Sequence, residues 1–253
     1  MNSDAMIIER IDDIIRCTLN IPERMNALCE AYEKPIERLY DMLLDDTIKV
    51  IIIRGQGGNF CSGPDIKLLG ENMKPDHLSI LLSKMNAFVV KLREGPWPVI
   101  TEVDGVAFGG GLGLALSSDI TYATQRANFC MGFLGLGAIP DLGVSYFLTE
   151  RVGLAKAREL AFTGEILNAE DALSCGMIHK IIDHESISEK VLSLAKKIAR
   201  SPKPTLTYTK RNLNRVSKLD LQTVLDLEAH IQPILLMSEA HKKAIKKMFP
   251  DMG

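Results

Sequence analysis

Residues 99–119, VITEVDGVAFGGGLGLALSSD, decide the fold of this chain. Residues 99–103 form an apolar run that Asp104-Gly105 breaks, which predicts a strand ending there. Three glycines, 109–111, then open a Leu- and Ala-rich segment that predicts a buried helix. A helix start leaves backbone N–H groups unpaired, and glycine lets a ligand approach the main chain. The stretch predicts an anion or oxyanion site, with close helix–strand packing and no ligand as the alternative.

Nucleotide-binding motifs do not fit this stretch. Gly109, Gly111 and Gly113 do not make G-x-G-x-x-G, because position 114 is Leu. No G-K-[ST] follows, as a P-loop requires. A dinucleotide or a triphosphate is therefore disfavoured as the ligand.

Composition places the chain among ordinary globular proteins. It has 253 residues, 46% of them hydrophobic and 25% charged, with a formal net charge of −2. This charge disfavours nucleic acid and acidic membrane surfaces as partners, and no run of about 18 apolar residues predicts a membrane span. MNSDAMIIER is not a signal peptide, and the five cysteines contain no C-x-x-C pair. We expect reduced thiols, no metal and a cytoplasmic protein.

The rest of the chain predicts strands that alternate with helices, which is typical of an α/β protein with crossover connections. Asp12-Asp13 predicts a hairpin at the domain edge, and Lys49 to Arg54, KVIIIR, a strand buried on both faces. A helix is expected over 27–44, with Asn26 as its cap and a kink or a helix restart at Pro35. The further helices are expected over 75–93, 144–152, 154–162, 168–173, 186–199, 205–216, 219–237 and 238–248, and the further strands over 120–123, 127–131 and 178–182. Apolar stripes on the last helices predict self-association.

Common catalytic constellations are missing. There is no G-x-S-x-G and no H-E-x-x-H, and the five histidines are expected at the surface. Cys61 favours packing over nucleophilic catalysis, because no positioned base accompanies it. Asp141, in Ile139-Pro140-Asp141-Leu142-Gly143, has two interpretations. It either caps a helix after a turn, or it is a carboxylate buried among apolar side chains with a raised pKa suited to proton abstraction.

Four motifs together resemble one family. NFCSGPDIK, VDGVAFGGGLGLALSSDI, GLGAIPDLG and RVGLAKARELAFTGEILNAEDALSCGMIHKII occur in an order and spacing similar to the crotonase superfamily, the enoyl-CoA hydratase/isomerase family. Residues 22–28, PERMNAL, also resemble the family's P-x-x-x-N-A-L. The resemblance implies an α/β spiral core of repeated ββα units over residues 1–200. It also implies a C-terminal α-helical trimerisation region over 201–253, giving a homotrimer or a dimer of trimers.

The resemblance also implies an acyl-CoA thioester substrate, with coenzyme A as part of the substrate and no separate cofactor. Two backbone N–H groups would bind the enolate-like oxyanion. Gly110 takes the place of one donor, and Pro64, which has no N–H, takes the place of the other. The two glutamates that family hydratases use correspond to Gly113 and Phe133 here. Asp141 matches the place of a catalytic aspartate in certain isomerases and dehalogenases, and its IPDLG context most resembles ring-opened epoxide isomerases of phenylacetyl-CoA degradation.

Substrate and CoA contacts are expected from a wider set of residues: Arg24, Ser62, Gly63, Asp65, Ile66, Lys67, Gly109, Phe133 and Lys247. A solvated surface charge is the alternative for Arg24 and Lys247, and Asp65 and Asp119 are expected to be structural acids. The combined prediction is an enoyl-CoA double-bond isomerase with a single aspartate base. The alternatives are a hydratase with an acid such as Glu71 or Asp104, and a non-catalytic acyl-CoA-binding protein.

Overall fold

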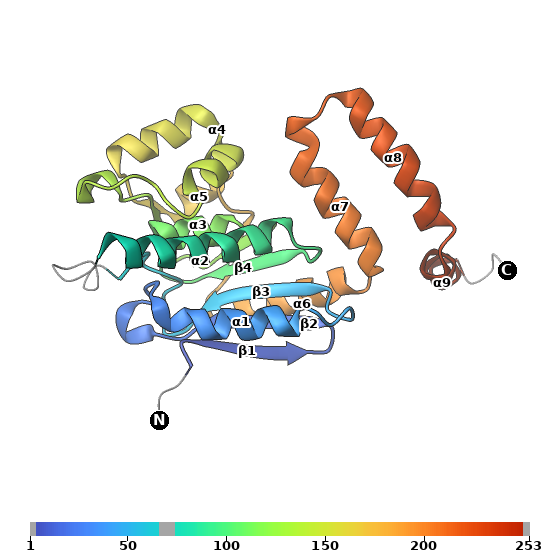
Figure 1. Ribbon diagram of the computed structural model, residues 1–253, viewed down its shortest axis with the longest axis horizontal. Helices are drawn as coiled ribbons and strands as arrows, with labels where there is room; N and C mark the ends of the chain where they lie inside the picture. The colour runs from blue at the N-terminus through green and yellow to red at the C-terminus, as the bar shows by residue number, and fades with distance from the viewer. Residues whose placement is uncertain (1–3, 66–73, 250–253) are drawn as a thin grey trace.

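The computed structural model describes residues 4–65 and 74–249, and a six-stranded sheet forms its centre (Figure 1). The strand order is β1-β2-β3-β4-β6-β9. The first two strands are antiparallel, as the predicted hairpin requires, and the remaining pairs are parallel. The strands are β1 (Met6–Ile11), β2 (Ile14–Leu19), β3 (Val50–Gly55), β4 (Val99–Val103), β6 (Ile120–Ala123) and β9 (Lys180–Ile181).

A smaller sheet accounts for two short strands that the sequence did not predict. It contains β5 (Val106–Phe108), β7 (Asn128–Cys130) and β8 (Leu167–Asn168). β5 lies between the predicted strand and the glycine turn, so the chain turns at Asp104-Gly105 and changes sheets before α3 (Gly110–Leu116) begins. This strand–turn–strand–helix order is one ββα unit of the expected α/β architecture.

Helices cover both faces of the large sheet. α6 (Ile187–Ala199) packs on one face, where it buries Val50 and Ile52 of β3. The opposite face buries Ile51 and Ile53 under α1 (Glu33–Met42) and α2 (Pro75–Glu94). Alternate residues of β3 therefore enter two different apolar cores, which confirms the prediction from its uninterrupted β-branched sequence.

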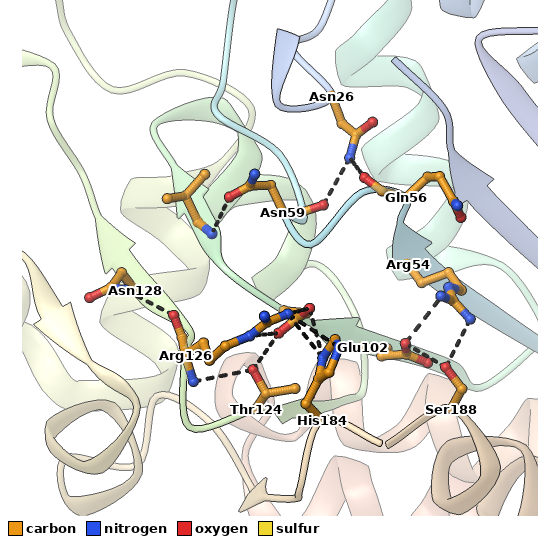
Figure 2. A network of polar contacts seen from close by, with 12 residues as sticks. Asn26, Arg54, Gln56, Asn59, Glu102, Thr124, Arg126, Asn128, His184 and Ser188 are labelled. Atoms are coloured by element: carbon orange, nitrogen blue, oxygen red, sulfur yellow. Dashed lines mark hydrogen bonds and ion pairs between the residues drawn. The ribbon is translucent and has the colours of Figure 1, made fainter. Parts of the chain in front are cut away.

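The expected role of Asn26 is wrong. The helix predicted over 27–44 consists of a 3₁₀ turn, Glu30–Tyr32, followed by α1, and Pro35 lies in the first turn of α1, where a missing N–H causes no kink. Asn26 is fully buried in a left-handed conformation. Its side-chain amide donates to the carbonyl oxygens of Gln56 and Asn59 at 2.9 and 2.8 Å (Figure 2). Asn26 therefore fixes the loop after β3 instead of capping a helix.

The two helices predicted on either side of Gly153 are confirmed, and they are the two halves of α4 (Val144–Thr163), which meet at a kink. Gly153 has φ 75° and ψ 160°, values outside the helical range, so the kink lies at this glycine. α5 (Ala169–Ser174) follows after Asn168, whose side chain accepts a hydrogen bond from the Asp171 N–H and caps the helix.

Three helices end the chain and project from the sheet layers (Figure 1). They are α7 (Lys203–Arg215), α8 (Leu221–Leu236) and α9 (Glu239–Met248). Lys210 of α7 is buried and donates to the carbonyl oxygens of Leu92 and Trp97 and to the carboxylate of Asp119, at 2.7, 2.9 and 2.7 Å. α7 is thus tied to the core, whereas α8 has no buried residue. A boundary between residues 200 and 201 stays a prediction.

Within residues 4–65 and 74–249, none of the helices combines the length and the apolar character that crossing a membrane requires. The cytoplasmic location stays a prediction.

Candidate active site

The glycine turn presents a backbone amide at the start of α3. Gly109 has φ 52° and ψ −125°, a conformation that side-chain-bearing residues avoid. The N–H groups of Leu112 and Gly113 both donate to the Gly109 carbonyl, so α3 begins at Gly110, within the run of three glycines. In the part of the chain that the structure describes, the Gly110 N–H meets no acceptor. It is therefore available to an oxygen atom of a substrate.

The NFCSG loop lies directly beside this amide. A Cβ atom added to Gly63 would be 2.9 Å from the Phe108 oxygen and 3.4 Å from the Gly110 nitrogen. The loop pairs with Leu28, whose N–H donates to the Gly63 oxygen and whose oxygen accepts from the Asp65 N–H, at 2.8 and 3.2 Å. Asn26, the NFCSG loop and the glycine turn thus pack against one another as one unit.

A second backbone donor is missing at the described positions of this loop. Pro64 has no N–H. The amide of Asp65 is bonded to Leu28. Neither position 64 nor position 65 therefore offers a spare backbone N–H, whereas the Gly110 N–H is unpaired among the described residues.

Asp141 brings a carboxyl group to the same place. A Cβ on Gly110 would lie 3.1 Å from Oδ1 of Asp141. This oxygen is buried and has no hydrogen-bond partner among the described residues. Burial raises the pKa of Asp141 above its ordinary value. The arrangement has the features of a general base held beside an oxyanion donor.

The turn around Asp141 is unlike the predicted capping turn. The Val144 N–H donates to the Asp141 oxygen at 3.0 Å, and the two central residues, Leu142 and Gly143, have φ 48° and 72°. These values describe a turn of type I′. Gly143 precedes α4, and no side chain caps this helix. The capping interpretation of Asp141 is therefore wrong, and its carboxyl group is left for another role.

Apolar side chains close the site around the carboxyl group. The Cζ atom of Phe133 is 3.6 Å from the Cβ position of Gly109, and the Leu142 side chain is 4% exposed. A Cβ on Gly113 would lie 2.7 Å from the Leu142 carbonyl oxygen, so no side chain fits there. The two positions at which the family resemblance places the hydratase glutamates, 133 and 113, hold an aromatic ring and a glycine in contact with backbone.

The predicted CoA-binding residues lie partly in one cluster. Arg24 forms an ion pair with Asp65 at 2.8 Å, and Ser62 Oγ lies 3.4 Å from the Arg24 oxygen. Arg24 is half exposed, whereas Asp65 is buried, in agreement with a structural acid. Asp119 accepts from the Val99 N–H and from Lys210, so it too is structural. Ile66, Lys67 and Glu71 lie outside the described residues, as does the side chain of Lys247.

Two rival catalytic residues are excluded by their surroundings. Burial raises the pKa of the Cys61 thiol to about 12, so packing is its role, as predicted. Burial alone would raise the pKa of Asp104, but hydrogen bonds from Arg126 and Thr124 lower it below its ordinary value. Arg126, Thr124 and His184 all contact this carboxylate, and Figure 2 shows the three side chains close together. Asp104 is therefore a partner in an ion-pair network.

Sequence reasoning missed the position of Leu142. Its side chain lies against Gly110, with Cδ1 2.7 Å from the Cβ position of that glycine. Leucine is not a residue that predicts a left-handed conformation. The following glycine was the one available signal, since type I′ turns favour Gly at their second central position.

Comparisons with known proteins identify relatives of this chain and of its fold. A family model described as enoyl-CoA hydratase/isomerase matches residues 9–249. The 1,2-epoxyphenylacetyl-CoA isomerase of Escherichia coli (strain K12) is 35% identical over 238 residues, which cover 92% of this chain and 90% of that protein. A probable enoyl-CoA hydratase of Mycobacterium tuberculosis (strain ATCC 25618 / H37Rv) is 33% identical over 228 residues, 87% of this chain and 78% of that protein. The crystal structure of an enoyl-CoA hydratase from Thermoplasma volcanium GSS1 superimposes with a TM-score of 0.88 at 30% identity, and the match covers 97% of each chain.

Proposed function

This chain belongs to the enoyl-CoA hydratase/isomerase family and has its fold, and we propose that it is a double-bond isomerase of an acyl-CoA with Asp141 as its acid–base group. The observation that carries the proposal is the buried, unpartnered Oδ1 of Asp141 beside the Gly110 amide. A carboxyl group in this environment has a raised pKa, which suits both removal and return of a proton near neutral pH.

In the proposed reaction, Asp141 removes a proton from the carbon α or γ to the thioester. The electron pair of the broken C–H bond spreads through the double bond to the thioester oxygen, and the Gly110 N–H donates to that oxygen. The protonated Asp141 then returns the proton to the other end of the conjugated system. The double bond has moved, no water has been added, and one acid has served both steps.

Hydration is the rival activity within the family, and hydratase names occur among the relatives. Adding water across a double bond usually requires a group that activates the water and a second that protonates carbon. The site has Phe133 and Gly113 at the positions where a hydratase would have its glutamates, and Asp104 is held in an ion-pair network. These features support isomerisation over hydration.

For the substrate, we propose a CoA ester similar to that of the E. coli isomerase, with a ring or a ring-derived acyl chain. The supporting features are the identity to that relative and the Asp141 context.

We also propose a homotrimer or a dimer of trimers. Exposed apolar residues on and beside α8 support self-association, namely Leu221, Leu225, Ile234, Leu236 and Met237, and light scattering after size-exclusion chromatography measures the assembly.

Deuterium exchange tests the proposed reaction. With 2-enoyl- or 3-enoyl-CoA in D₂O, we expect deuterium in the acyl chain and a shifted double bond. Asp141→Asn should lower the exchange rate by about 10²–10⁴-fold, while Asp104→Asn, which changes a carboxylate outside the site, should retain exchange. A 3-hydroxyacyl-CoA product that survives Asp141→Asn would indicate a hydratase. Binding of acyl-CoA without any exchange would indicate a non-catalytic protein.

A further inference from the structure

Two cavities meet at the residue that follows Asp141. The first is enclosed between α1, α2 and α3 and has a free volume of about 10 Å³. The second lies between α2 and the start of α4 and has a volume of about 280 Å³. Val89 and Leu142 line both of them. Leu142 therefore forms part of the wall that separates the two spaces.

The first cavity is too small for an acyl chain. A space of 10–15 Å³ holds about one water-sized probe, so the first cavity admits no more than about one methyl group. Its wall includes Leu28, whose backbone pairs with Pro64, Leu114 of α3, and Leu142, whose side chain lies against Gly110. A longer acyl group on the Gly110 amide has to leave this space in another direction.

The second cavity has a suitable size and chemistry. Its volume is close to the lower end of the range of about 300–1,000 Å³ that is usual for ligand sites. Val89, Val90 and Phe147 supply apolar surface. Two of the lining cations are engaged, because Arg93 pairs with Glu150 at 2.7 Å and the Lys218 ammonium group lies 5.3 Å from the centre of the Tyr146 ring. The carboxylate of Glu94, which also lines the cavity, disfavours a negatively charged ligand. This cavity suits an uncharged hydrocarbon or aromatic group.

Leu142 is held in place by strain and by contact. Leu142 has a φ of 48°, a left-handed conformation that is unfavourable for a residue with a side chain. Its carbonyl oxygen lies against Gly113 and its side chain lies against Gly110, so the surrounding helix fixes both. Strained residues of this kind concentrate at functional sites.

We propose that the cavity between α2 and α4 binds the distal apolar part of the acyl group, and that Leu142 determines which acyl chains reach it. The inference rests on the proposed function, because it takes Gly110 and Asp141 as the reacting end of the site. The substrate class is a CoA ester whose acyl group is uncharged at its far end and extends past Leu142.

Binding of saturated acyl-CoAs, from acetyl to dodecanoyl, tests the assignment by calorimetry on the intact protein. Each methylene that enters the cavity should tighten binding about fourfold. The gain should stop at one chain length in the natural protein and at a longer one in Leu142→Ala. Val90→Trp fills the mouth of the cavity from an exposed position and should remove the gain for the longest chains.

Ile80→Trp is the matched control. Ile80 lies on the same helix, is 54% exposed against 58% for Val90, and lines neither cavity. It should leave the chain-length series unchanged. The same limiting chain length in the natural protein, Leu142→Ala and Val90→Trp would overturn the assignment. Because the ligands are saturated, this outcome is independent of deuterium exchange, so the cavity assignment and the proposed reaction fail separately.

Discussion

Oδ1 of Asp141 lies 3.1 Å from the point where a Cβ atom would stand on Gly110, and a Cβ there would also be 2.7 Å from Cδ1 of Leu142. The two residues are 31 positions apart in the chain, and the turn before α4 brings the acid to the tip of α3. The absence of a side chain at Gly110 is what lets the acid approach the free amide. Four predictions follow from this site and from the way the last helices are attached.

Gly110→Ala should impair catalysis more than stability. The new methyl group would push against Leu142 and Asp141, and a displacement of about 1 Å in a reacting group can cost about 10²-fold in rate. Gly135→Ala is the control, because its Cβ would have no atom within 4 Å, and it should change the free energy of unfolding by less than about 0.5 kcal/mol. Deuterium exchange into the acyl chain and thermal unfolding are measured for both variants. Equal exchange rates in Gly110→Ala and Gly135→Ala would contradict the prediction.

Pro64→Ala should raise the exchange rate. The pairing with Leu28 uses the Gly63 oxygen and the Asp65 amide, so alanine can keep it while adding an N–H beside the Gly110 nitrogen. One oxyanion donor is worth about 10²–10³-fold in rate, and we expect a gain of at least tenfold. Pro202→Ala, before α7, controls for the chain entropy of losing a proline. An unchanged or lower rate would mean that position 64 does not face the thioester oxygen.

At neutral pH, Asp141→Asn should be more stable than the natural protein. This difference in the free energy of unfolding should be smaller at low pH. Burial raises the pKa of Asp141 in the folded state, so the folded protein binds this proton more tightly than the unfolded chain does. The natural protein therefore loses stability as pH rises from the ordinary carboxyl range, about 4, through the raised pKa. The variant has no such loss. Chemical denaturation at pH 7 and below pH 4 measures the difference, which should shrink at the lower pH; a constant difference would refute the assignment.

Lys210→Met should loosen the C-terminal helices from the core. The substitution leaves Asp119 and two carbonyl groups without their shared ammonium donor. Breaking a buried pair in this way costs about 3–5 kcal/mol. Lys242→Met, which removes an exposed pair with Glu239, should cost less than about 1 kcal/mol. Denaturant unfolding compares the two, and similar losses would show that α7 is not held through Lys210.

The sequence predicted those helices, strands and turns whose conformation is set by residues adjacent in the chain. The β-branched run of β3, the hairpin at Asp12-Asp13 and the glycine turn before α3 follow from local chemistry, and the structure confirms each. The short β5 and β8 were missed because two or three residues carry no periodic signal. Asn26 was misassigned because a cap and a buried loop anchor use the same amide group.

By itself, the sequence determined that this is an α/β protein of the enoyl-CoA hydratase/isomerase family, that position 64 is a proline without an N–H and that Asp141 follows an apolar segment. Only the tertiary structure decided that Oδ1 of Asp141 is buried beside Gly110, that the Asp65 amide is bonded to Leu28, and that Leu142 stands between two cavities. The physical reason is that burial, an unpaired amide and a cavity wall depend on atoms distant in the chain, whereas turns and strand runs depend on adjacent residues.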